Sequence, residues 1–444
     1  MLIEFCFENF KSYAGKTSLL LTTSSKIRSK AHHKIPVNSL NVLKYAGIYG
    51  DNASGKTNVV EAIGFFQSLV CFPNVNVQFP FDTLTFKGNK EKPSKFRCVF
   101  SIKDVIYEYG YEVQLGFGVS KPHKILREYL NIIGSGPVRG KCLYDSGNRE
   151  IISKTLIKDE YKQMFDFLYK GYKELNKANP SKLFLSFINE SDKRVMVKTM
   201  TDVFSKVFDY IRNNIVVIGA NAINLNFFSH DSLDTINLYT KQFDKGLEEI
   251  TLTDVSLETV EKKVPPQILE QINGQLNSGR VKNVTLSLNN RDFYFISKES
   301  NVSPIKFETL SIKHKYIEEP FSFSEESEGT RKFIVLMSYF SSFKDKVFVI
   351  DELERSMHPS SSEYLFDFFE KETKNSNTQF IFTSHNITFM DVNLRHDETY
   401  FADKDMFGSS ILYGLTDFRT TTGQPIGKLF EEGTYRKVSE NRKA

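Results

Sequence analysis

The sequence contains no tryptophan and only four cysteines among its 444 residues. The cysteines are Cys6, Cys71, Cys98 and Cys142; they form no C-x-x-C pair, and no histidine stands at a metal-ligand spacing from them. The common sequence patterns of zinc and dithiol redox sites are therefore absent. Because three of the four lie in or beside apolar runs, we expect them to be reduced cysteines of the protein core.

Long apolar runs are also missing. No stretch approaches the ~20 apolar residues that cross a bilayer, and the first ten residues, MLIEFCFENF, contain no basic residue. We therefore expect no membrane association, no secretory signal and a cytoplasmic location. The formal net charge of +4 is small for this length. It permits nucleic-acid binding without indicating it, because such binding needs clustered charge.

Apolar patterning predicts an N-terminal region rich in strands. The segments LIEFCFENF (2–10) and TSLLLTT (17–23) form a plausible strand pair, and residues 95–133 have the pattern of a β-meander. The run VLKYAGIYG (42–50) predicts one buried strand that leads into a glycine-rich loop. A helix is expected after the loop, since apolar residues recur there at helical spacing, namely at Val59, Val60, Ala62, Ile63 and Phe66.

Later elements are predicted in the same way. Residues 155–213 have a mostly helical pattern, NIVVIGA (214–220) resembles a buried strand, and 233–275 predict helix, short strand and helix. A hairpin is expected over 284–299, around Asn289–Asn290–Arg291. From residue 320 the pattern is α/β, with helices over 328–343 and 360–372 and strands over 346–351 and 378–385.

The loop GDNASGKT fits the phosphate-binding pattern G-x-x-x-x-G-K-[ST]. Backbone N–H groups of such a loop surround phosphates at a helix N-terminus. We expect Lys56 to reach the β- and γ-phosphates of ATP and Thr57 to ligate Mg²⁺. The predicted nucleotide-binding residues here are Gly50, Asp51, Asn52, Ala53, Ser54, Gly55, Lys56, Thr57 and Asn58.

Two acids end the predicted strand KVFVID, and a histidine ends the next one. Asp351 is expected to hold Mg²⁺ through its water shell, and Glu352 to orient and deprotonate the attacking water. Glu354 is a weaker candidate for either role. His385, in FIFTSHN, follows the next predicted strand, where it can face the γ-phosphate.

A turn containing Ser327, Gly329 and Thr330 precedes an apolar helix and lies upstream of the acidic pair. The order of phosphate loop, S-x-G-[TQ] turn, D-E strand and histidine resembles ATP-binding-cassette (ABC) ATPases. Within these, FENFKSY, ESEGTR, DELERSMHP and TSHN resemble the SMC/RecF/OLD branch and its AAA-type members in prokaryotic phage defence.

This resemblance implies an α/β fold: an ABC-type P-loop ATPase head with an N-terminal antiparallel β subdomain and a mainly helical insertion. The implied domains are 1–140 (β subdomain and phosphate loop), 141–320 (insertion, largely helical with some strands) and 321–444 (signature, acidic strand and histidine). The glutamine of the family's glutamine loop is ambiguous here, with Gln67 and Gln78 as candidates.

The resemblance further implies a homodimer, or a higher homo-oligomer, that sandwiches two ATP molecules. Ser327, Gly329 and Thr330 of one subunit would then contact the γ-phosphate bound at the partner's Lys56. Glu328 departs from the transporter-type signature, which has a second glycine at this position. An acid there should weaken closure unless its side chain points away.

Two functions remain open. The first is a dimerising ATPase switch or sensor in an antiviral complex, whose effector, expected to be a nuclease, is a separate polypeptide. Asp403, Lys404 and Asp405 have the pattern of a surface turn, and only about 60 residues follow His385, which is too few for a fused nuclease domain. A slowly hydrolysing scaffold is a further alternative, against which the intact Glu352 argues.

The second function is that of an SMC/RecF-like ATPase that binds DNA in repair. Its best basic cluster is KIRSKAHHK, with Lys26, Arg28, Lys30 and Lys34, but the helices of 155–213 are too short for an SMC arm. The adjacent His32 and His33 are not expected to form a metal pair, because neighbouring side chains of an extended loop point apart.

Overall fold

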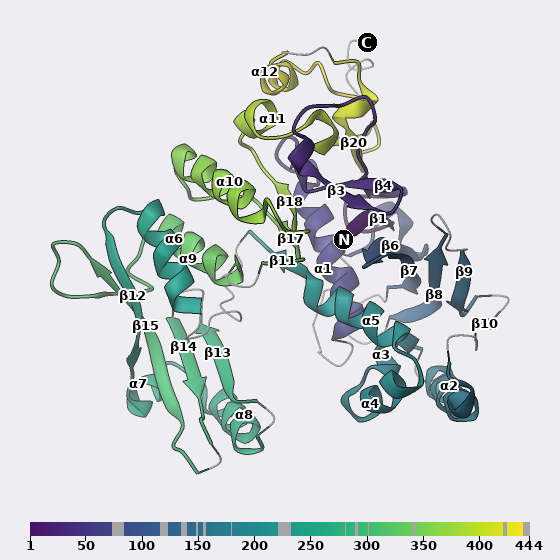
Figure 1. Ribbon diagram of the computed structural model, residues 1–444, viewed down its shortest axis with the longest axis horizontal. Helices are drawn as coiled ribbons and strands as arrows, with labels where there is room; N and C mark the ends of the chain where they lie inside the picture. The colour runs from purple at the N-terminus through teal and green to yellow at the C-terminus, as the bar shows by residue number, and fades with distance from the viewer. Residues whose placement is uncertain are drawn as a thin grey trace. The chain divides into compact units, whose positions relative to one another are not determined.

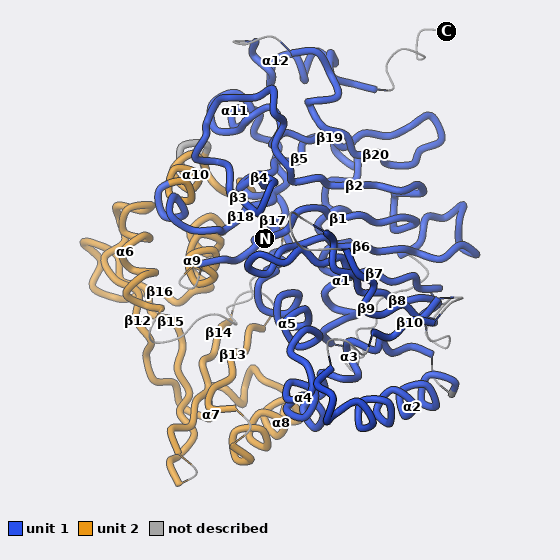
Figure 2. The backbone as a smooth tube through the Cα atoms, turned by 45° about the vertical axis from the view of Figure 1, so that its right-hand side comes forward, with its two compact units in different colours: residues 1–219, 344–353, 371–444 blue, residues 220–343, 354–370 orange. Residues whose placement is uncertain are grey.

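A computed structural model of the protein describes residues 1–72, 84–115, 123–134, 140–147, 150–153, 157–178, 180–220, 232–279, 281–288, 292–300, 302–340, 343–420 and 424–437. They form two compact units, coloured separately in Figure 2. Unit 1 comprises residues 1–219, 344–353 and 371–444. Unit 2 comprises residues 220–343 and 354–370.

Unit 1 is built around a six-stranded sheet in the order β11-β17-β18-β5-β19-β20. Neighbouring strands are parallel from β11 to β19, and β20 is antiparallel to β19. The strands are β5 (Tyr45–Tyr49), β11 (Ile215–Ile218), β17 (Val347–Ile350), β18 (Gln379–Thr383), β19 (Thr399–Lys404) and β20 (Ser410–Gly414). β5, β17 and β18 are buried along their whole length, which explains their continuous apolar sequences.

The predicted single strand over 42–50 is wrong in its extent, because the structure divides it at Lys44. β4 (Leu40–Leu43) pairs with β3 (Lys34–Val37), whereas β5 enters the six-stranded sheet. The Lys44 N–H donates to the carbonyl of His33, and the Lys44 carbonyl accepts from Phe380 N–H. The buried Nζ of Lys44 donates to the Thr373 carbonyl at 2.5 Å. Lys44 therefore lies between the strand that pairs with β3 and the strand that pairs with β18.

The predicted N-terminal antiparallel β subdomain is confirmed. It is a seven-stranded sheet in the order β10-β9-β8-β7-β6-β1-β2, antiparallel throughout. Figure 1 shows β1 and the strands from β6 to β10 side by side. The strands are β1 (Leu2–Glu8), β2 (Thr17–Leu20), β6 (Ser94–Ile102), β7 (Val105–Gln114), β8 (Lys124–Ile133), β9 (Lys141–Asp145) and β10 (Ile151–Ile152). Cys6, Cys71 and Cys98 are free and buried, as expected for core cysteines, and Cys142 is free and half-buried.

Helices supply the rest of this part of unit 1. α1 (Lys56–Cys71) follows the phosphate loop, and all five apolar residues predicted for its buried side are buried. Residues 155–213 are mostly helical where described, which confirms that prediction. Their elements are η5 (Asp159–Tyr161), α2 (Lys162–Ala178), α3 (Phe184–Ile188), α4 (Ser191–Met200), α5 (Val203–Asp209) and the π-helix η6 (Tyr210–Asn214).

Gln67 of α1 supports the junction between η6 and β11. Its Nε2 donates to the carbonyls of Ile211 at 2.8 Å and Ile215 at 2.7 Å. These bonds give Gln67 a structural role at that junction. The other glutamine-loop candidate, Gln78, lies outside the described residues.

Unit 2 contains a second antiparallel sheet, in the order β12-β15-β14-β13, with β16 paired to β15. The predicted helix–strand–helix and hairpin are confirmed, although the hairpin tip 289–291 lies outside the described residues. The elements are α6 (Leu233–Phe243), β12 (Leu247–Asp254), α7 (Leu257–Glu261), α8 (Pro266–Asn277), β13 (Asn283–Leu288), β14 (Asp292–Ser297), β15 (Lys306–His314), β16 (Phe321–Ser322) and α9 (Glu328–Phe340). α10 (Pro359–Thr373) follows the acidic segment.

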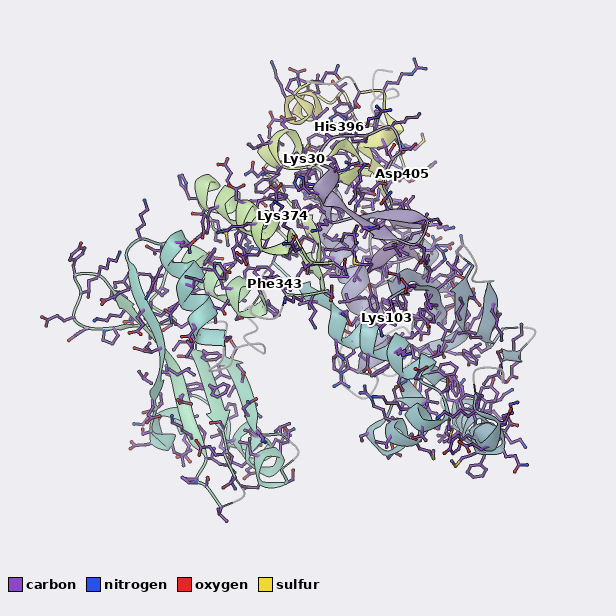
Figure 3. The ribbon with its side chains drawn as sticks, in the orientation of Figure 1. Lys30, Lys103, Phe343, Lys374, His396 and Asp405 are labelled. Atoms are coloured by element: carbon purple, nitrogen blue, oxygen red, sulfur yellow. The ribbon has the colours of Figure 1, made fainter. Side chains whose placement is uncertain are left out.

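The C-terminal part of unit 1 packs on β19 and β20. Its short helices are α11 (Thr388–Val392), η8 (His396–Glu398), η9 (Leu415–Asp417) and α12 (Ile426–Glu431). Of these, α11 and α12 are seen near the C-terminus in Figure 1. Asp405, labelled in Figure 3, begins the turn from β19 to β20, and its Oδ1 accepts from Phe407 N–H and Ser409 N–H. The prediction that Asp403 and Lys404 also lie in this turn is wrong, because they are the last residues of β19 and pair with β20.

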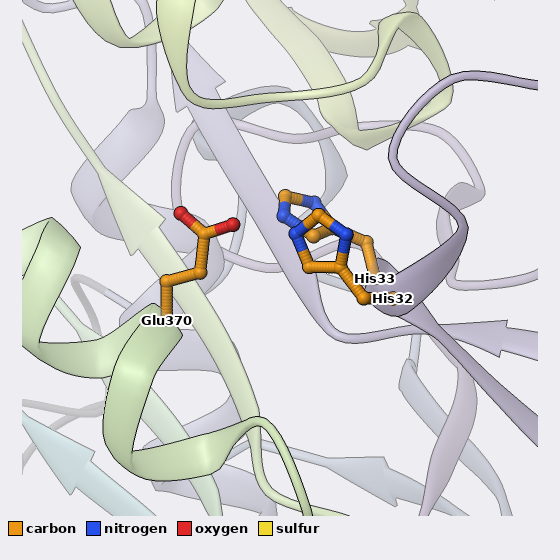
Figure 4. A group of neighbouring side chains, drawn as sticks. All are labelled: His32, His33 and Glu370. Atoms are coloured by element: carbon orange, nitrogen blue, oxygen red, sulfur yellow. The ribbon is translucent and has the colours of Figure 1, made fainter.

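His32 and His33 lie on the 3-10 helix η1 (Ala31–His33), and η3 (Lys87–Asn89) precedes β6. The expectation that the two histidines point apart is wrong, because a helical turn brings their rings into contact with centroids 4.5 Å apart (Figure 4). The Nδ1 atom of the buried His33 lies 2.9 Å from Oε2 of the buried Glu398.

Among the described residues, none of the helices combines the length and the apolar character that a bilayer span requires.

Candidate nucleotide site

The phosphate loop joins β5 to α1, so the predicted strand–loop–helix context is present. Gly50 has φ +154°, and a Cβ on it would collide with the Ala402 carbonyl. Gly55, the N-cap of α1, has φ +114°, and a Cβ there would lie 2.5 Å from Oγ of Ser410. Neither position can accept a side chain without moving the loop or its support.

Two serines from distant segments hold this loop. Ser410 Oγ on β20 donates to the Ser54 carbonyl at 2.5 Å and lies 2.7 Å from Ser12 Oγ. Asn58 Nδ2 donates to Ser12 Oγ at 2.6 Å. Neither Ser12 nor Ser410 was predicted to be a site residue, and the only signal for Ser12 in the sequence was its place in FENFKSY.

Lys56 folds back over the loop. The residue is only 7% exposed, and its Nζ donates to the carbonyls of Gly50 at 2.7 Å and Asp51 at 3.0 Å. These bonds hold the ammonium group within the loop, next to the N-terminus of α1. A positive charge beside a helix N-terminus is an arrangement that favours phosphate binding.

Thr57 and Asp351 come together as predicted for metal ligands. Thr57 Oγ1 lies 3.3 Å from Asp351 Oδ1, at the end of β17. Asp351 is buried, and its Oδ1 also accepts from Thr383 Oγ1 at 2.6 Å. Neighbouring hydroxyl and carboxylate oxygens are the donor types that Mg²⁺ prefers, so these residues fit that ion.

Glu352 has a backbone conformation that is uncommon for a residue with a side chain, with φ +48°. Its N–H donates to Thr383 Oγ1 at 2.7 Å. Thr383 therefore fixes both acidic residues, by accepting from Glu352 and donating to Asp351. Such backbone strain clusters at functional sites because the surroundings must hold it in place. Thr383 is a site residue that sequence reasoning missed.

His385 and the start of the phosphate loop share one cavity of about 400 Å³. The strand register brings them together, since Ser384 N–H donates to the Ile48 carbonyl of the neighbouring β5. The residues lining the cavity are Tyr49, Gly50, Asp51, Asn52, Ser384, His385, Ile387, Phe430, Glu431 and Arg436. Within unit 1, His385 thus lies close to the loop, as predicted. The C-terminal residues Phe430, Glu431 and Arg436 also line this cavity, which the sequence did not predict.

The signature residues lie in unit 2, where they form the start of α9. Ser327 Oγ accepts from Thr330 N–H at 3.1 Å and lies 2.8 Å from Thr330 Oγ1, which makes Ser327 an N-cap. A Cβ on Gly329 would lie 2.5 Å from the Ser356 carbonyl, so this glycine permits a close backbone approach. Glu326 precedes the turn and lies 2.6 Å from Nε2 of His314. The turn is therefore locally fixed, with Ser327 and Glu328 exposed.

A phosphate loop, an acidic pair and a histidine gathered at one edge of a parallel sheet define a P-loop ATPase-type site, and the fold is of the α/β P-loop ATPase class. Over residues 46–116 and 209–391, the chain matches the family described as "AAA domain, putative AbiEii toxin, Type IV TA system". These ranges span more than half of the chain, which therefore belongs to this family. The curated proteins contain no match.

Three solved structures are similar to the chain. An SMC head bound to the C-terminal winged-helix domain of ScpA has a TM-score of 0.41 and 12% identity, covering 93% of this chain and 96% of that one. The SMC head domain from Thermotoga maritima has a TM-score of 0.39 and 13% sequence identity, and the match covers 93% of this chain and 98% of that one. The third is an SMC head from Pyrococcus furiosus with an extended coiled coil, bound to the C-terminal domain of ScpA. It has a TM-score of 0.41 and 13% sequence identity, and the match covers 98% of this chain and 99% of that one.

Proposed function

We propose that the protein binds and hydrolyses ATP as an ABC-type ATPase. The observation that carries this is the convergence of Thr57 and Thr383 on Asp351, with Lys56 folded over the adjoining loop. Purified protein should release phosphate from ATP in a Mg²⁺-dependent reaction. Absence of both nucleotide binding and phosphate release would overturn the proposal.

The chain's own residues have distinct roles in this reaction. Lys56 and the loop N–H groups bind the β- and γ-phosphates, and His385 contacts the γ-phosphate from the shared cavity. Glu352 orients the attacking water and accepts its proton. Thr57 and Asp351 would hold Mg²⁺, which when bound neutralises charge on the phosphate oxygens. Thr383 holds Asp351 and Glu352 in position through its two hydrogen bonds to them.

The ATPase acts as a dimerising switch in this proposal. Ser327 and the first N–H groups of α9 are suited to bind an anion, and the exposure of Ser327 leaves the turn accessible to a second copy. Mixing Lys56→Ala subunits with Ser327→Ala subunits should form one intact composite site per heterodimer and restore part of the ATPase rate lost by each variant alone. A mixture no more active than its components would exclude sharing of sites between subunits.

The switch serves a prokaryotic antiviral complex whose effector, a nuclease, is a separate protein. Support comes from the family description, which names a toxin and a toxin–antitoxin system. Expressed with its neighbouring genes, the wild type should protect cells against phage and Lys56→Ala should not. Undiminished protection by Lys56→Ala, or nucleic-acid cleavage by the purified chain alone, would contradict this assignment.

A second candidate function is direct DNA binding, as in an SMC/RecF-like repair ATPase. It is favoured by the exposure of Lys26 and Arg28 on the segment before η1, where Lys30, labelled in Figure 3, also lies. Duplex DNA binding should then weaken as salt rises and be lost on neutralising these three residues. Binding insensitive to salt would argue against this function.

A further inference from the structure

The C-terminal segment Pro425–Lys437 is fastened to the six-stranded sheet beside the phosphate loop. Phe401 of β19 stacks on Phe430, with centroids 4.8 Å apart and ring planes 7° from parallel, and also on Tyr435 at 5.9 Å. Tyr413 donates its hydroxyl to the Tyr435 carbonyl at 3.0 Å. Aromatic contacts thus place the residue after Tyr435 at a fixed position on the cavity wall.

That residue is Arg436, and it reaches the phosphate loop. Its Nη2 lies 2.7 Å from Oδ2 of Asp51, and both residues line the cavity that contains His385. The side chains are 35% exposed for Arg436 and 58% for Asp51. The next residue, Lys437, points elsewhere, because it pairs with Asp417 and lies over the Tyr413 ring.

The charge of Asp51 is unfavourable for phosphate binding. Asp51 directly follows Gly50 in a loop whose backbone is arranged to surround an anion. A carboxylate there repels a triphosphate, and Glu431 adds a second carboxylate to the same cavity. A guanidinium group paired with Asp51 cancels the nearer negative charge.

We propose that Arg436 is a positioning residue of the nucleotide site, which neutralises Asp51 and holds the C-terminal segment as a wall of the phosphate cavity. This inference rests on the proposed nucleotide binding. Arg436→Ala should weaken ATP binding about 5- to 10-fold, since one unpaired charge at loop distance and intermediate dielectric has an effect of that order. The effect on AMP should be smaller, because AMP carries less charge.

The test measures equilibrium dissociation constants for ATP and AMP with the full chain, at low and high salt. The variants are Arg436→Ala, Arg436→Lys, and the double variant Arg436→Ala/Asp51→Asn, with Lys437→Ala as the matched control. Arg436→Lys should stay within about 3-fold of the wild type for ATP. Removing the Asp51 charge in the double variant should recover most of the affinity lost by Arg436→Ala.

Three results would overturn the proposed role of Arg436. Equal weakening of ATP and AMP together with a lower melting temperature would show a merely structural role and overturn it. So would wild-type affinity in Arg436→Ala, or a double variant as weak as Arg436→Ala. In each of these cases the wild type still binds ATP and the proposed function stands. A wild-type chain that binds no nucleotide would overturn both.

Discussion

The two sheets of unit 1 use polar side chains in opposite ways. In the six-stranded sheet they gather at or just beyond the ends of β5, β17 and β18, where Thr57 and Thr383 both contact Asp351. On the seven-stranded sheet they spread over a face as ion pairs. There Arg97 pairs with both Glu4 and Glu108.

Strand direction explains this difference. The carboxyl ends of parallel strands share one edge, so loops from distant parts of the sequence meet there and can form a site. In an antiparallel sheet the strand ends alternate, and polar residues find partners directly across the ladder. The first arrangement concentrates function, whereas the second contributes solubility and a modest amount of stability.

The largest effect should follow removal of the loop ammonium. Lys56→Ala is expected to weaken ATP binding at least about 100-fold, because several charge-assisted contacts are lost together. The matched control is Lys95→Ala on the antiparallel sheet, where Lys95 pairs with Glu8 at 3.6 Å. Nucleotide titration should show no change for the control. A comparable loss in both variants would remove the distinction between the sheets.

Glu352→Gln should be nearly as severe for catalysis but not for binding. The rate of ATP hydrolysis is expected to fall about 10²- to 10⁴-fold, the range for a lost general base. ATP affinity should change little, so the closed dimer should accumulate in size-exclusion chromatography with ATP. The exposed Glu363 on α10 provides a control as Glu363→Gln. Full activity in Glu352→Gln would refute the assignment of the base.

The antiparallel sheet contains one buried acid that departs from its surface-pair pattern. Glu128 accepts from Phe184 N–H at 2.6 Å, Leu185 N–H at 3.0 Å and Tyr109 Oη at 2.9 Å. Burial raises the pKa of Glu128 from 4.5 to about 7. The folded state therefore holds a proton that the unfolded chain releases between these values, and stability falls as pH rises through this window.

The expected loss is about 3 kcal/mol of unfolding free energy between pH 4.5 and pH 8. Glu128→Gln, which cannot titrate, should flatten this dependence in denaturant titrations across the range. The exposed Glu160 supplies the control as Glu160→Gln, which should keep the wild-type slope. An unchanged slope in Glu128→Gln would mean that Glu128 does not titrate in this range.

The smallest effect is expected on the exposed face of the antiparallel sheet. Arg127 makes two bonds to Asp145, from Nε at 3.0 Å and from Nη2 at 2.7 Å. The Arg127 side chain is nevertheless 42% exposed, so a double-mutant cycle with Asp145 should give a coupling of about 1 kcal/mol or less. A coupling above about 3 kcal/mol would show that these pairs are a main source of stability.

The parts of the site that lie within one continuous motif were predictable from the sequence. The loop residues and the Asp351–Glu352 pair are recognisable because their spacing is itself the signal. Thr383, Ser12 and Ser410 are not, since an isolated serine or threonine is uninformative until a strand register brings it to the loop. The break at Lys44 was missed for a similar reason, because it depends on contacts with His33 and Phe380.

The position of β5 also has a consequence for synthesis of the chain. In the sheet, β5 lies between β18 and β19, so both of its neighbours are made more than 300 residues after it. At roughly 5–20 residues per second, the ribosome needs about 15–70 seconds to supply them. Throughout that interval the phosphate loop follows a strand without its partners, and a chain released before residue 379 would lack them altogether. We therefore expect the segment of β5 and the phosphate loop, which is the first part of the site to be synthesised, to depend on chaperones during translation.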